Sequence, residues 1–367
     1  MQGVVKPNPQ RRSQGITTLL ALGAAALLAA CATEGPRTQQ GQDQAANAAS
    51  ISTPAAPPTP EEDALRQLVV LQERLDRVAA PLLVNNPQLC KGNARQLLGF
   101  TAKTKYSYSA DYIDAAQKLF KLDERLQVTG VLPGSGAARV GVARGDGLVA
   151  VQDKPLPQGP NAERQAAAIL APLVNKHTSI KLTVLRDGSN RDLEVPLTLA
   201  CAFRVELGNV DAVNAYSDGH RVLVTRGMLN FARSDTDLAY VLAREFAHNA
   251  LGHPAKLHTS GTLTGVIDNL IRVKPDLGMT HGTAGIKPYP QEIDTAADTI
   301  GLYMAARAGY AIDGAASFWQ RLAVQTPASV MNGYTAIHPS TASRLAAIEK
   351  ASTEIKGKLD SKKALLP

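Results

Sequence analysis

The chain has 367 residues, of which 44% are hydrophobic and 4% aromatic, and its formal net charge at pH 7 is +7. This length suits about two domains of ordinary size. The basic excess lies at the two ends, in Lys6, Arg11 and Arg12 and in five lysines after residue 349. Because the body between them is nearly neutral, nucleic acid is not expected as a partner.

The N-terminal segment has the pattern of a targeting signal. Arg11 and Arg12 precede an apolar run over residues 16–30, which ends in Leu-Ala-Ala before Cys31. This resembles a bacterial lipoprotein signal, although a plain secretory signal or an uncleaved helix has similar features. The run is short for a membrane span. We therefore expect removal of residues 1–30 and a lipid anchor on Cys31. Because Ala32 follows the cysteine, the resemblance implies the periplasmic side of the outer membrane.

The other two cysteines, Cys90 and Cys201, are left as a pair. In an oxidising compartment such a pair predicts a disulfide, and two buried thiols are the alternative. The bridge would close a loop of about 110 residues, a constraint on the order of 4–5 kcal/mol in the chain-entropy model.

Residues 31–58 are rich in Gln, Ala, Pro and Ser and have no apolar period. They are expected to form a disordered tether. Order is predicted to begin at Thr59, a good N-cap, followed by Pro60 at the first helical position and by Glu62, which completes a capping box. Apolar residues then recur at helical spacing, so residues 59–96 are assigned to an N-terminal helix of the domain that resumes after residue 200.

Residues 97–200 change to a pattern of strands and turns. Pro133-Gly-Ser-Gly-Ala-Ala138 follows a strand, Gly141-Val-Ala-Arg-Gly-Asp146 precedes another, and a helix over 162–173 and a strand over 180–186 come next, with a hairpin turn at Asp187-Gly188. This order resembles bacterial PDZ domains. The resemblance implies binding of a peptide C-terminus by strand addition, with the carboxylate loop near Leu98-Gly99-Phe100. A spacer of the same shape that binds no peptide is the alternative.

Residues 201–355 are predicted to be mostly helical. A hairpin over 214–229 turns at Asp218-Gly219, and a helix capped by Ser234 or Asp235 runs to about Gly252. Residues 255–289 read as irregular, with one amphipathic piece over 266–273. Further helices are expected over 291–308, after Asp313 and after Ser340, and residues 356–367 form a basic tail. The predicted fold class is α+β.

Four separated motifs lie in this region: Asn214-Ala-Tyr with Val224-Thr-Arg-Gly-Met-Leu229, Leu242-Ala-Arg-Glu-Phe-Ala-His248 with Gly252-His253, Asp294-x-x-Ala-Asp298-x-x-Gly301, and His338-Pro with Arg344. Their order resembles the HtpX and CAAX-prenyl-protease family of zinc metallopeptidases, in its soluble periplasmic branch. The resemblance implies a gluzincin-type domain that acts on extended or misfolded envelope proteins.

The family's residues carry over as follows. Its two helix histidines fall at Arg244 and His248, and its catalytic glutamate falls at Glu245, which would activate a metal-bound water. Its third ligand falls at Asp294, and Asp298 matches the carboxylate that orients a ligand imidazole. His338 and Arg344 match side chains beside the active site. The strand over 221–226 matches the sheet edge that pairs with extended substrate.

Two positions depart from this pattern. Arg244 has only hydrogen-bond donors and cannot ligate zinc, and Asp294 is one methylene shorter than the family's glutamate. His248 and Asp294 remain, with His338 as a candidate replacement ligand, so the expected cofactor is zinc or no metal at all. We predict that Arg244 pairs with Glu245, Asp294 or Asp298.

Two functions follow from this pattern. The favoured one is a degenerate peptidase that binds polypeptide without hydrolysing it, and the alternative is an active metalloendopeptidase with a non-standard metal site. His253 is expected to be structural or exposed and not a ligand, and Trp319 is expected to lie in the core.

Overall fold

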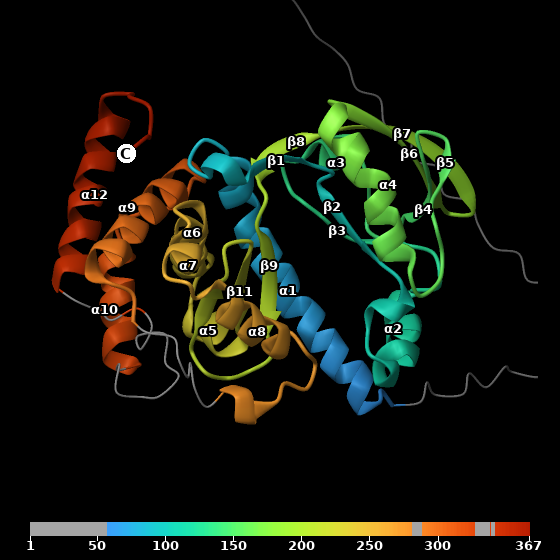
Figure 1. Ribbon diagram of the computed structural model, residues 1–367, viewed down its shortest axis with the longest axis horizontal. Helices are drawn as coiled ribbons and strands as arrows, with labels where there is room; N and C mark the ends of the chain where they lie inside the picture. The colour runs from blue at the N-terminus through green and yellow to red at the C-terminus, as the bar shows by residue number, and fades with distance from the viewer. Residues whose placement is uncertain (1–56, 281–287, 327–337, 339–341) are drawn as a thin grey trace, which may run out of the picture. The chain divides into compact units, whose positions relative to one another are not determined.

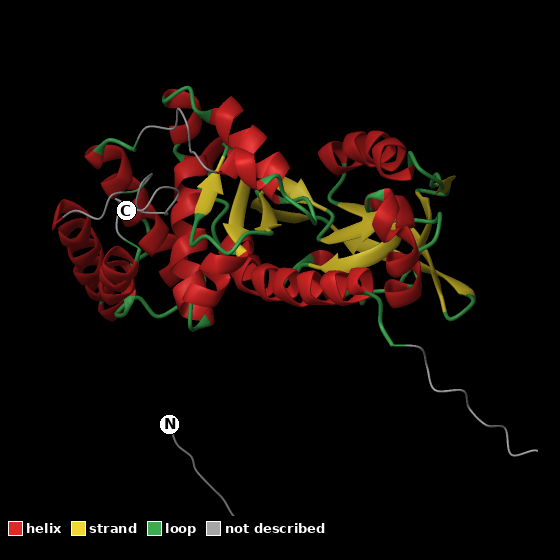
Figure 2. Ribbon diagram, turned by 90° about the horizontal axis from the view of Figure 1, so that it is seen from below, coloured by secondary structure: helices red, strands yellow, loops and turns green. Residues whose placement is uncertain are grey.

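The computed structural model of the protein describes residues 57–280, 288–326, 338 and 342–367. The expected signal segment, Cys31, most of the tether and Ser340 lie outside these ranges. Within the described ranges, each helix is too short or too polar to cross a membrane. Helices and strands mix as the α+β prediction expects, and the strands gather in two groups that each have helices packed against them (Figure 2).

The elements up to residue 201 are the helices α1 (Pro60–Val84), α2 (Ile113–Phe120), α3 (Gly136–Arg139) and α4 (Ala162–Lys176), the short 3-10 helices η1 (Lys91–Asn93), η2 (Lys105–Ser107) and η3 (Ala110–Tyr112), and the strands β1 (Ala94–Leu97), β2 (Phe100–Lys103), β3 (Gln127–Val131), β4 (Gly147–Val151), β5 (Lys154–Pro155), β6 (Ser179–Arg186), β7 (Ser189–Pro196) and β8 (Thr198–Cys201) (Figure 1).

Helix α1 begins where the sequence predicts. Thr59 Oγ1 accepts a hydrogen bond from the Glu62 amide at 3.3 Å, and Pro60 takes the first helical position. The Glu62 carboxylate was expected to complete a capping box, but it is buried and accepts a hydrogen bond from Lys118 Nζ at 2.6 Å. The Glu62 carboxylate therefore contacts α2 instead of capping the start of α1.

Strands β2 to β7 form an antiparallel sheet with the order β2-β3-β4-β6-β7, and β5 pairs with β4. Asp187 and Gly188 have φ of 52° and 75°, as a two-residue hairpin turn requires. The expected helix over 162–173 is present as α4 and extends to Lys176. The buried residues of this sheet and its helices form an apolar cluster of their own. Strand β2 lies at the sheet edge, directly after Leu98-Gly99.

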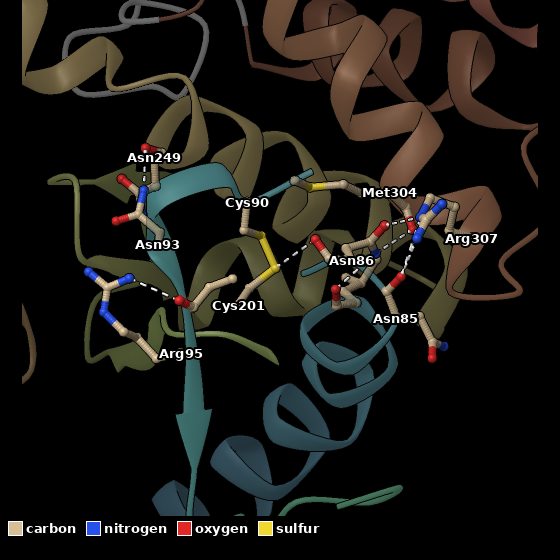
Figure 3. Close-up of a disulfide and its surroundings, with 11 residues drawn as sticks. Asn85, Asn86, Cys90, Asn93, Arg95, Cys201, Asn249, Met304 and Arg307 are labelled. Carbon is tan, nitrogen blue, oxygen red and sulfur yellow. Dashed lines mark hydrogen bonds between the residues drawn. A yellow bond between two sulfur atoms is a disulfide. The ribbon is translucent and has the colours of Figure 1, made fainter. Parts of the chain in front are cut away.

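The chain enters and leaves this module through one ribbon. Strand β1 pairs antiparallel with β8, with Ala94 opposite Cys201. The predicted disulfide between Cys90 and Cys201 is confirmed and joins the base of the ribbon to the end of α1 (Figure 3). Next to it, Asn86 Nδ2 donates to the Met304 carbonyl at 3.0 Å. The disulfide region is therefore tied to the helix that carries Met304, which belongs to the functional site described below.

The elements after residue 201 are the strands β9 (Arg204–Gly208), β10 (Ala215–Ser217) and β11 (Arg221–Thr225), the helices α5 (Arg226–Phe231), α6 (Asp235–Ala250), α7 (His253–Lys256), α8 (Ser260–Leu270), α9 (Gln291–Arg307), α10 (Ala315–Gln325) and α12 (Ala342–Asp360), and the short 3-10 helix η4 (Leu277–Thr280).

The three strands of this region correct one prediction. The hairpin of β10 and β11 is present, but β11 also pairs in parallel with β9, so the sheet order is β10-β11-β9. The strand over 221–226 is therefore central and not an edge. Strand β10 is one edge of this sheet, and its three residues are buried. On the other edge, the Gln72 side chain donates to the Val205 carbonyl and accepts from the Leu207 amide, at 3.2 and 3.1 Å.

Helices α6 and α9 lie side by side and form the frame of the site (Figure 1). Ser234 caps α6 by accepting from the Asp237 amide at 3.0 Å. Thirteen of the sixteen residues of α6 are buried, so this helix is enclosed rather than amphipathic. A Cβ at Gly301 of α9 would lie 2.9 Å from Arg244 Cα and 3.0 Å from Arg244 N. The absence of a side chain at Gly301 therefore allows the two backbones to touch.

Other boundaries after residue 250 differ from the expectation. Helices α7 and α8 occupy part of the segment over 255–289 that was expected to be irregular, and α8 starts six residues before the expected amphipathic piece. Residues 281–287 of this segment lie outside the described ranges. Gly314, and not Asp313, is the N-cap of α10. The basic tail is partly helical because α12 continues to Asp360, and the Leu365 carbonyl accepts from Arg307 Nη1 at 3.2 Å. Contacts with distant elements thus fix segments for which the local pattern is ambiguous.

Candidate functional site

Helix α6 contributes Arg244, Glu245 and His248 to one buried cluster. Glu245 is fully buried, and its Oε2 accepts a hydrogen bond from Ser217 Oγ at 2.8 Å. Its other oxygen, Oε1, lies 3.4 Å from His338 Nε2. The glutamate that the sequence proposes as a general base is therefore held by the last residue of β10 and by an imidazole.

The guanidinium of Arg244 joins α6 to α9. Its Nη2 donates to Asp294 Oδ1 and its Nε donates to Asp298 Oδ1, both at 2.6 Å. Its Nη1 lies 3.8 Å from Glu245 Oε1. The predicted pairing of Arg244 is thus confirmed for Asp294 and Asp298. Arg244 is only 1% exposed. Among the described residues it is the largest side chain that is fully buried.

Arg344 of α12 makes a second buried guanidinium pair. Its Nε and Nη2 donate to Asp298 at 2.8 and 3.0 Å, and its Nη1 donates to the His338 carbonyl at 3.0 Å. The Trp319 ring lies 5.4 Å from the guanidinium carbon of Arg244 and 5.3 Å from that of Arg344. Trp319 is buried, as expected, and it also contacts both arginines at cation–π distance.

Three nitrogen and oxygen atoms of metal-ligand type converge at the centre of the cluster. His338 Nδ1 lies 3.0 Å from Asp294 Oδ1, and His248 Nε2 lies 3.5 Å from the same oxygen. Ligand atoms of His248, Asp294 and His338 all lie within 4.8 Å of one another. Among the described residues, His248 Nε2 has no hydrogen-bond partner. Its other nitrogen, Nδ1, lies 3.0 Å from His253 Nδ1.

Burial controls the ionisation of the imidazoles. Burial, the largest cause, acts together with nearby cationic groups and lowers the pKa of His248 to about 4 and those of His253 and His338 to about 3. These three side chains are therefore neutral at pH 7. Burial is the largest single influence on the pKa of Asp294 and of Asp298 and would raise both. Arg244, together with the imidazoles around Asp294 and with Arg344 beside Asp298, outweighs it and lowers both pKa values below the usual range.

The charges of the cluster nearly balance without a metal. Two guanidinium groups, of Arg244 and Arg344, face three carboxyl groups, of Glu245, Asp294 and Asp298, which gives a formal charge of −1. The cavity beside Arg244 has about 10 Å³, room for at most one water. Among the described residues, the carboxylates of the cluster are thus balanced mainly by direct contact with the two guanidinium groups.

A catalytic zinc does not fit this arrangement. Such a zinc has three protein ligands and one open position, but Arg244 occupies one expected ligand position and already binds the Asp294 oxygen on which the imidazoles converge. A divalent ion about 4 Å from a guanidinium would be repelled by about 8 kcal/mol at an effective dielectric constant near 20. The carboxylates offset part of this, but Arg244 already engages two of them.

All the site residues that the resemblance places in the active site come together: Arg244, Glu245, His248, Asp294, Asp298, His338 and Arg344. Sequence reasoning missed Ser217 and Tyr289. The Tyr289 ring lies 4.6 Å from that of His248 and 4.9 Å from that of His338. Neither residue has a local signal that marks it, because each reaches the cluster through tertiary packing. His253, expected to be structural, is buried and contacts His248.

A cleft of about 450 Å³ lies next to this cluster, at the turn between β10 and β11. Asp218, Gly219 and His220 form one wall, and Asn249 and the first turns of α8 form another. The Asn249 side chain fixes the turn because it accepts from the Gly219 amide and donates to the Arg221 carbonyl, at 2.6 and 3.0 Å. The cleft is therefore attached to α6 one residue after His248.

Comparisons with solved structures cover less than a third of this chain. The crystal structure of the HtrA3 PDZ domain bound to a phage-derived ligand is 19% identical, covers 28% of this chain and 86% of that chain, and has a TM-score of 0.21. The HtrA-type protease AlgW with a decapeptide is 22% identical, covers 29% of this chain and 30% of that chain, and also has a TM-score of 0.21. Scores this low do not assign the module to a fold.

Sequence comparisons concern the domain that carries the cluster. Residues 191–352 match the model of peptidase family M48. The mitochondrial metalloendopeptidase OMA1 of Arabidopsis thaliana is 27% identical over 143 residues, or 38% of this chain and 29% of that protein. The OMA1 protein of Schizosaccharomyces pombe is 28% identical over 138 residues, or 36% of this chain and 41% of that protein. The chain thus matches less than half of the length of either relative. The match to the model of peptidase family M48 is thus confined to residues 191–352, less than half of this chain.

Proposed function

We propose that this protein is a degenerate metallopeptidase that binds extended or misfolded polypeptides without hydrolysing them. The observation that carries this proposal is the pair of 2.6 Å hydrogen bonds from Arg244 to Asp294 and Asp298. A residue without acceptor atoms stands where the family places a zinc ligand, and it also binds the carboxylate that stands at another ligand position. Peptide hydrolysis by a metal-bound water requires both positions.

The surroundings of Glu245 support the same proposal. A general base must reach the water that it deprotonates, but the Glu245 side chain is fully buried and bound by Ser217. The edge strand β10 beside it is buried as well, so an extended substrate has no open sheet edge there in the described structure. Hydrolysis would require these contacts to separate.

Polypeptide binding is assigned to the surfaces that remain open. Strand β2 is an edge strand with exposed residues, and apolar side chains of β2 and α4 that are only partly buried pack against one cluster. In a PDZ-like module, a peptide C-terminus adds to such an edge, and the loop at Leu98-Gly99 receives its carboxylate. The cleft of about 450 Å³ beside Asn249 is a second candidate contact for an extended chain.

The proposal places the protein on the periplasmic side of the bacterial outer membrane, anchored by lipid on Cys31. Two features of the sequence support this location: the basic and apolar pattern before Leu-Ala-Ala-Cys31, and the cysteine pair that forms a disulfide. A lipid anchor would hold the protein near newly exported polypeptides, and a tether of about 28 residues would give it a reach on the order of 30 Å.

One observation favours a second candidate, an active metalloendopeptidase with a non-standard ligand set. The three potential donors of His248, Asp294 and His338 lie within 4.8 Å of one another. In this case Glu245 would act as the base and Arg244 would turn away from Asp294 on metal binding.

Incubation of the protein with unfolded casein and zinc distinguishes the two. The proposed function predicts saturable casein binding with no cleavage above that of a Glu245→Gln variant. Binding should be reduced by substitutions at the exposed edge of β2, such as Ala102→Pro, which removes a backbone donor. Val128, opposite Ala102, directs its own amide and carbonyl to residues 145 and 146, so the Ala102 amide faces the open edge. Zinc-dependent cleavage that the Glu245→Gln variant lacks would establish the second candidate, and absence of casein binding would reject the first.

A further inference from the structure

The cluster on α6 and α9 holds a set of potential metal ligands that differs from the family set. His248 Nε2 and His338 Nδ1 lie 3.5 and 3.0 Å from Asp294 Oδ1. Two ligands of a tetrahedral zinc ion, each bound at ~2.0–2.1 Å, lie about 3.3 Å apart. The two separations from Asp294 are close to this value, and ligand atoms of all three residues lie within 4.8 Å of one another. His338 belongs to a segment outside α6 and α9.

His248 has a further property of a ligand imidazole. Its Nδ1 is held by His253 at 3.0 Å, and its Nε2 is buried, directed toward Asp294 and without a hydrogen-bond partner among the described residues. Ligand histidines use one nitrogen for an orienting hydrogen bond and leave the other for the ion. A buried nitrogen with no partner is otherwise disfavoured.

Arg244 opposes a metal at this place in two ways. Its Nη2 binds the same Asp294 oxygen at 2.6 Å, and its charge lies within the cluster. The guanidinium supplies one positive charge where an ion would supply two. It is thus an internal cation that competes with a metal for Asp294.

We propose that the protein holds a latent zinc-type site formed by His248, Asp294 and His338, which Arg244 keeps closed. This inference rests on the proposed function, because it requires that the native protein does not hold zinc tightly. It goes beyond that function by naming the one side chain that prevents use of this ligand set and by predicting that its replacement opens the site.

The test replaces Arg244 without changing the charge of the cluster. Arg244→Met alone leaves an additional uncompensated buried carboxylate, so it is combined with Asp298→Asn, which restores the formal charge of −1. Circular dichroism first verifies that the double variant folds. Zinc affinity and stoichiometry are then measured by competition with a chromophoric chelator, and the shift of Tm on addition of zinc gives an independent readout. Arg244→Leu/Asp298→Asn, which also removes the guanidinium and adds no ligand atom, serves as a second variant if the first double variant does not fold.

We expect the double variant to bind one zinc per chain at least 100-fold more tightly than the native protein. Adding His338→Gln or Asp294→Asn to it should abolish the gain. Adding His220→Gln should not, because His220 is an exposed histidine outside the cluster. A folded double variant with no gain in affinity, or with a gain that survives His338→Gln, would overturn the inference and leave the proposed function intact. Tight zinc binding by the native protein, with hydrolysis, would instead reject the proposed function.

Discussion

Arg244 Nη2 lies 2.6 Å from Asp294 Oδ1, and both side chains are only 2% exposed. Breaking a buried ion pair from one side leaves an uncompensated charge and costs about 3–5 kcal/mol. We therefore expect Arg244→Ala to lower the free energy of unfolding by about this amount in urea titrations.

The matched control is Arg226→Ala, which removes an exposed ion pair with Asp211. Exposed pairs contribute about 0–1 kcal/mol. Equal stability of the two variants would contradict the account of Arg244 as the central cation of the cluster.

The contact between Gly301 and the backbone of Arg244 gives a second prediction. A Cβ at this position would lie 2.9 Å from Arg244 Cα, so α6 and α9 would have to separate. Overpacking of this kind costs about 1–3 kcal/mol or more. We expect Gly301→Ala to lower Tm. By contrast, Gly357→Ala on α12, where a Cβ would meet nothing within 4 Å, should leave Tm unchanged or raise it. A neutral Gly301→Ala variant would show that the helices are not in backbone contact.

The buried histidines predict loss of stability in weak acid. In the folded chain the pKa of His248 is lowered to about 4 and that of His253 to about 3, mainly by burial. Unfolding restores values near 6.5, so below that pH the unfolded chain binds protons that the folded chain does not. Each such histidine lowers the free energy of unfolding by about 1.4 kcal/mol per pH unit as the pH falls from about 6.5 toward its folded pKa. Urea titrations at pH 7.5, 6 and 5 with EDTA measure this. Stability that is constant or rises over this range would show that these imidazoles are not buried as neutral groups.

The disulfide gives a prediction that does not depend on the site. Cys90 and Cys201 are buried and close a long loop around the inserted module. The double variant Cys90→Ala/Cys201→Ala should lose on the order of 4 kcal/mol of unfolding free energy, part of it from the unfolded chain. Cys31→Ala, outside the bridge, should not change it. A thiol titration of denatured, unreduced protein that finds Cys90 and Cys201 free would contradict the bridge.

Local signals in the sequence were sufficient for several features. The caps at Thr59 and Ser234 and the turn at Asp187-Gly188 depend on a few neighbouring residues, and the structure contains all three. The pairing of Arg244 with Asp294 and Asp298 followed from the family resemblance, which places these carboxylates at the site, together with the charge of the guanidinium. The cysteine pair was identified by count and compartment.

Other features depend on parts of the chain that meet only in the folded protein. The central position of β11 follows from its parallel pairing with β9, and no local pattern of the hairpin indicates a third strand. Ser217 and Tyr289 reach Glu245 and the imidazoles through tertiary packing. The Glu62 side chain pairs with Lys118 because α1 and α2 pack together. Propensity and motif spacing do not encode such contacts.

The central claim is that Arg244 replaces a zinc ligand and its guanidinium replaces the ion. The most direct measurement is the zinc content of the native protein after saturation with zinc and exhaustive dialysis, determined by elemental analysis alongside Arg244→Met/Asp298→Asn. The account predicts far less than one zinc per native chain and about one per variant chain. One tightly held zinc per native chain, equal to that of the variant, would contradict it.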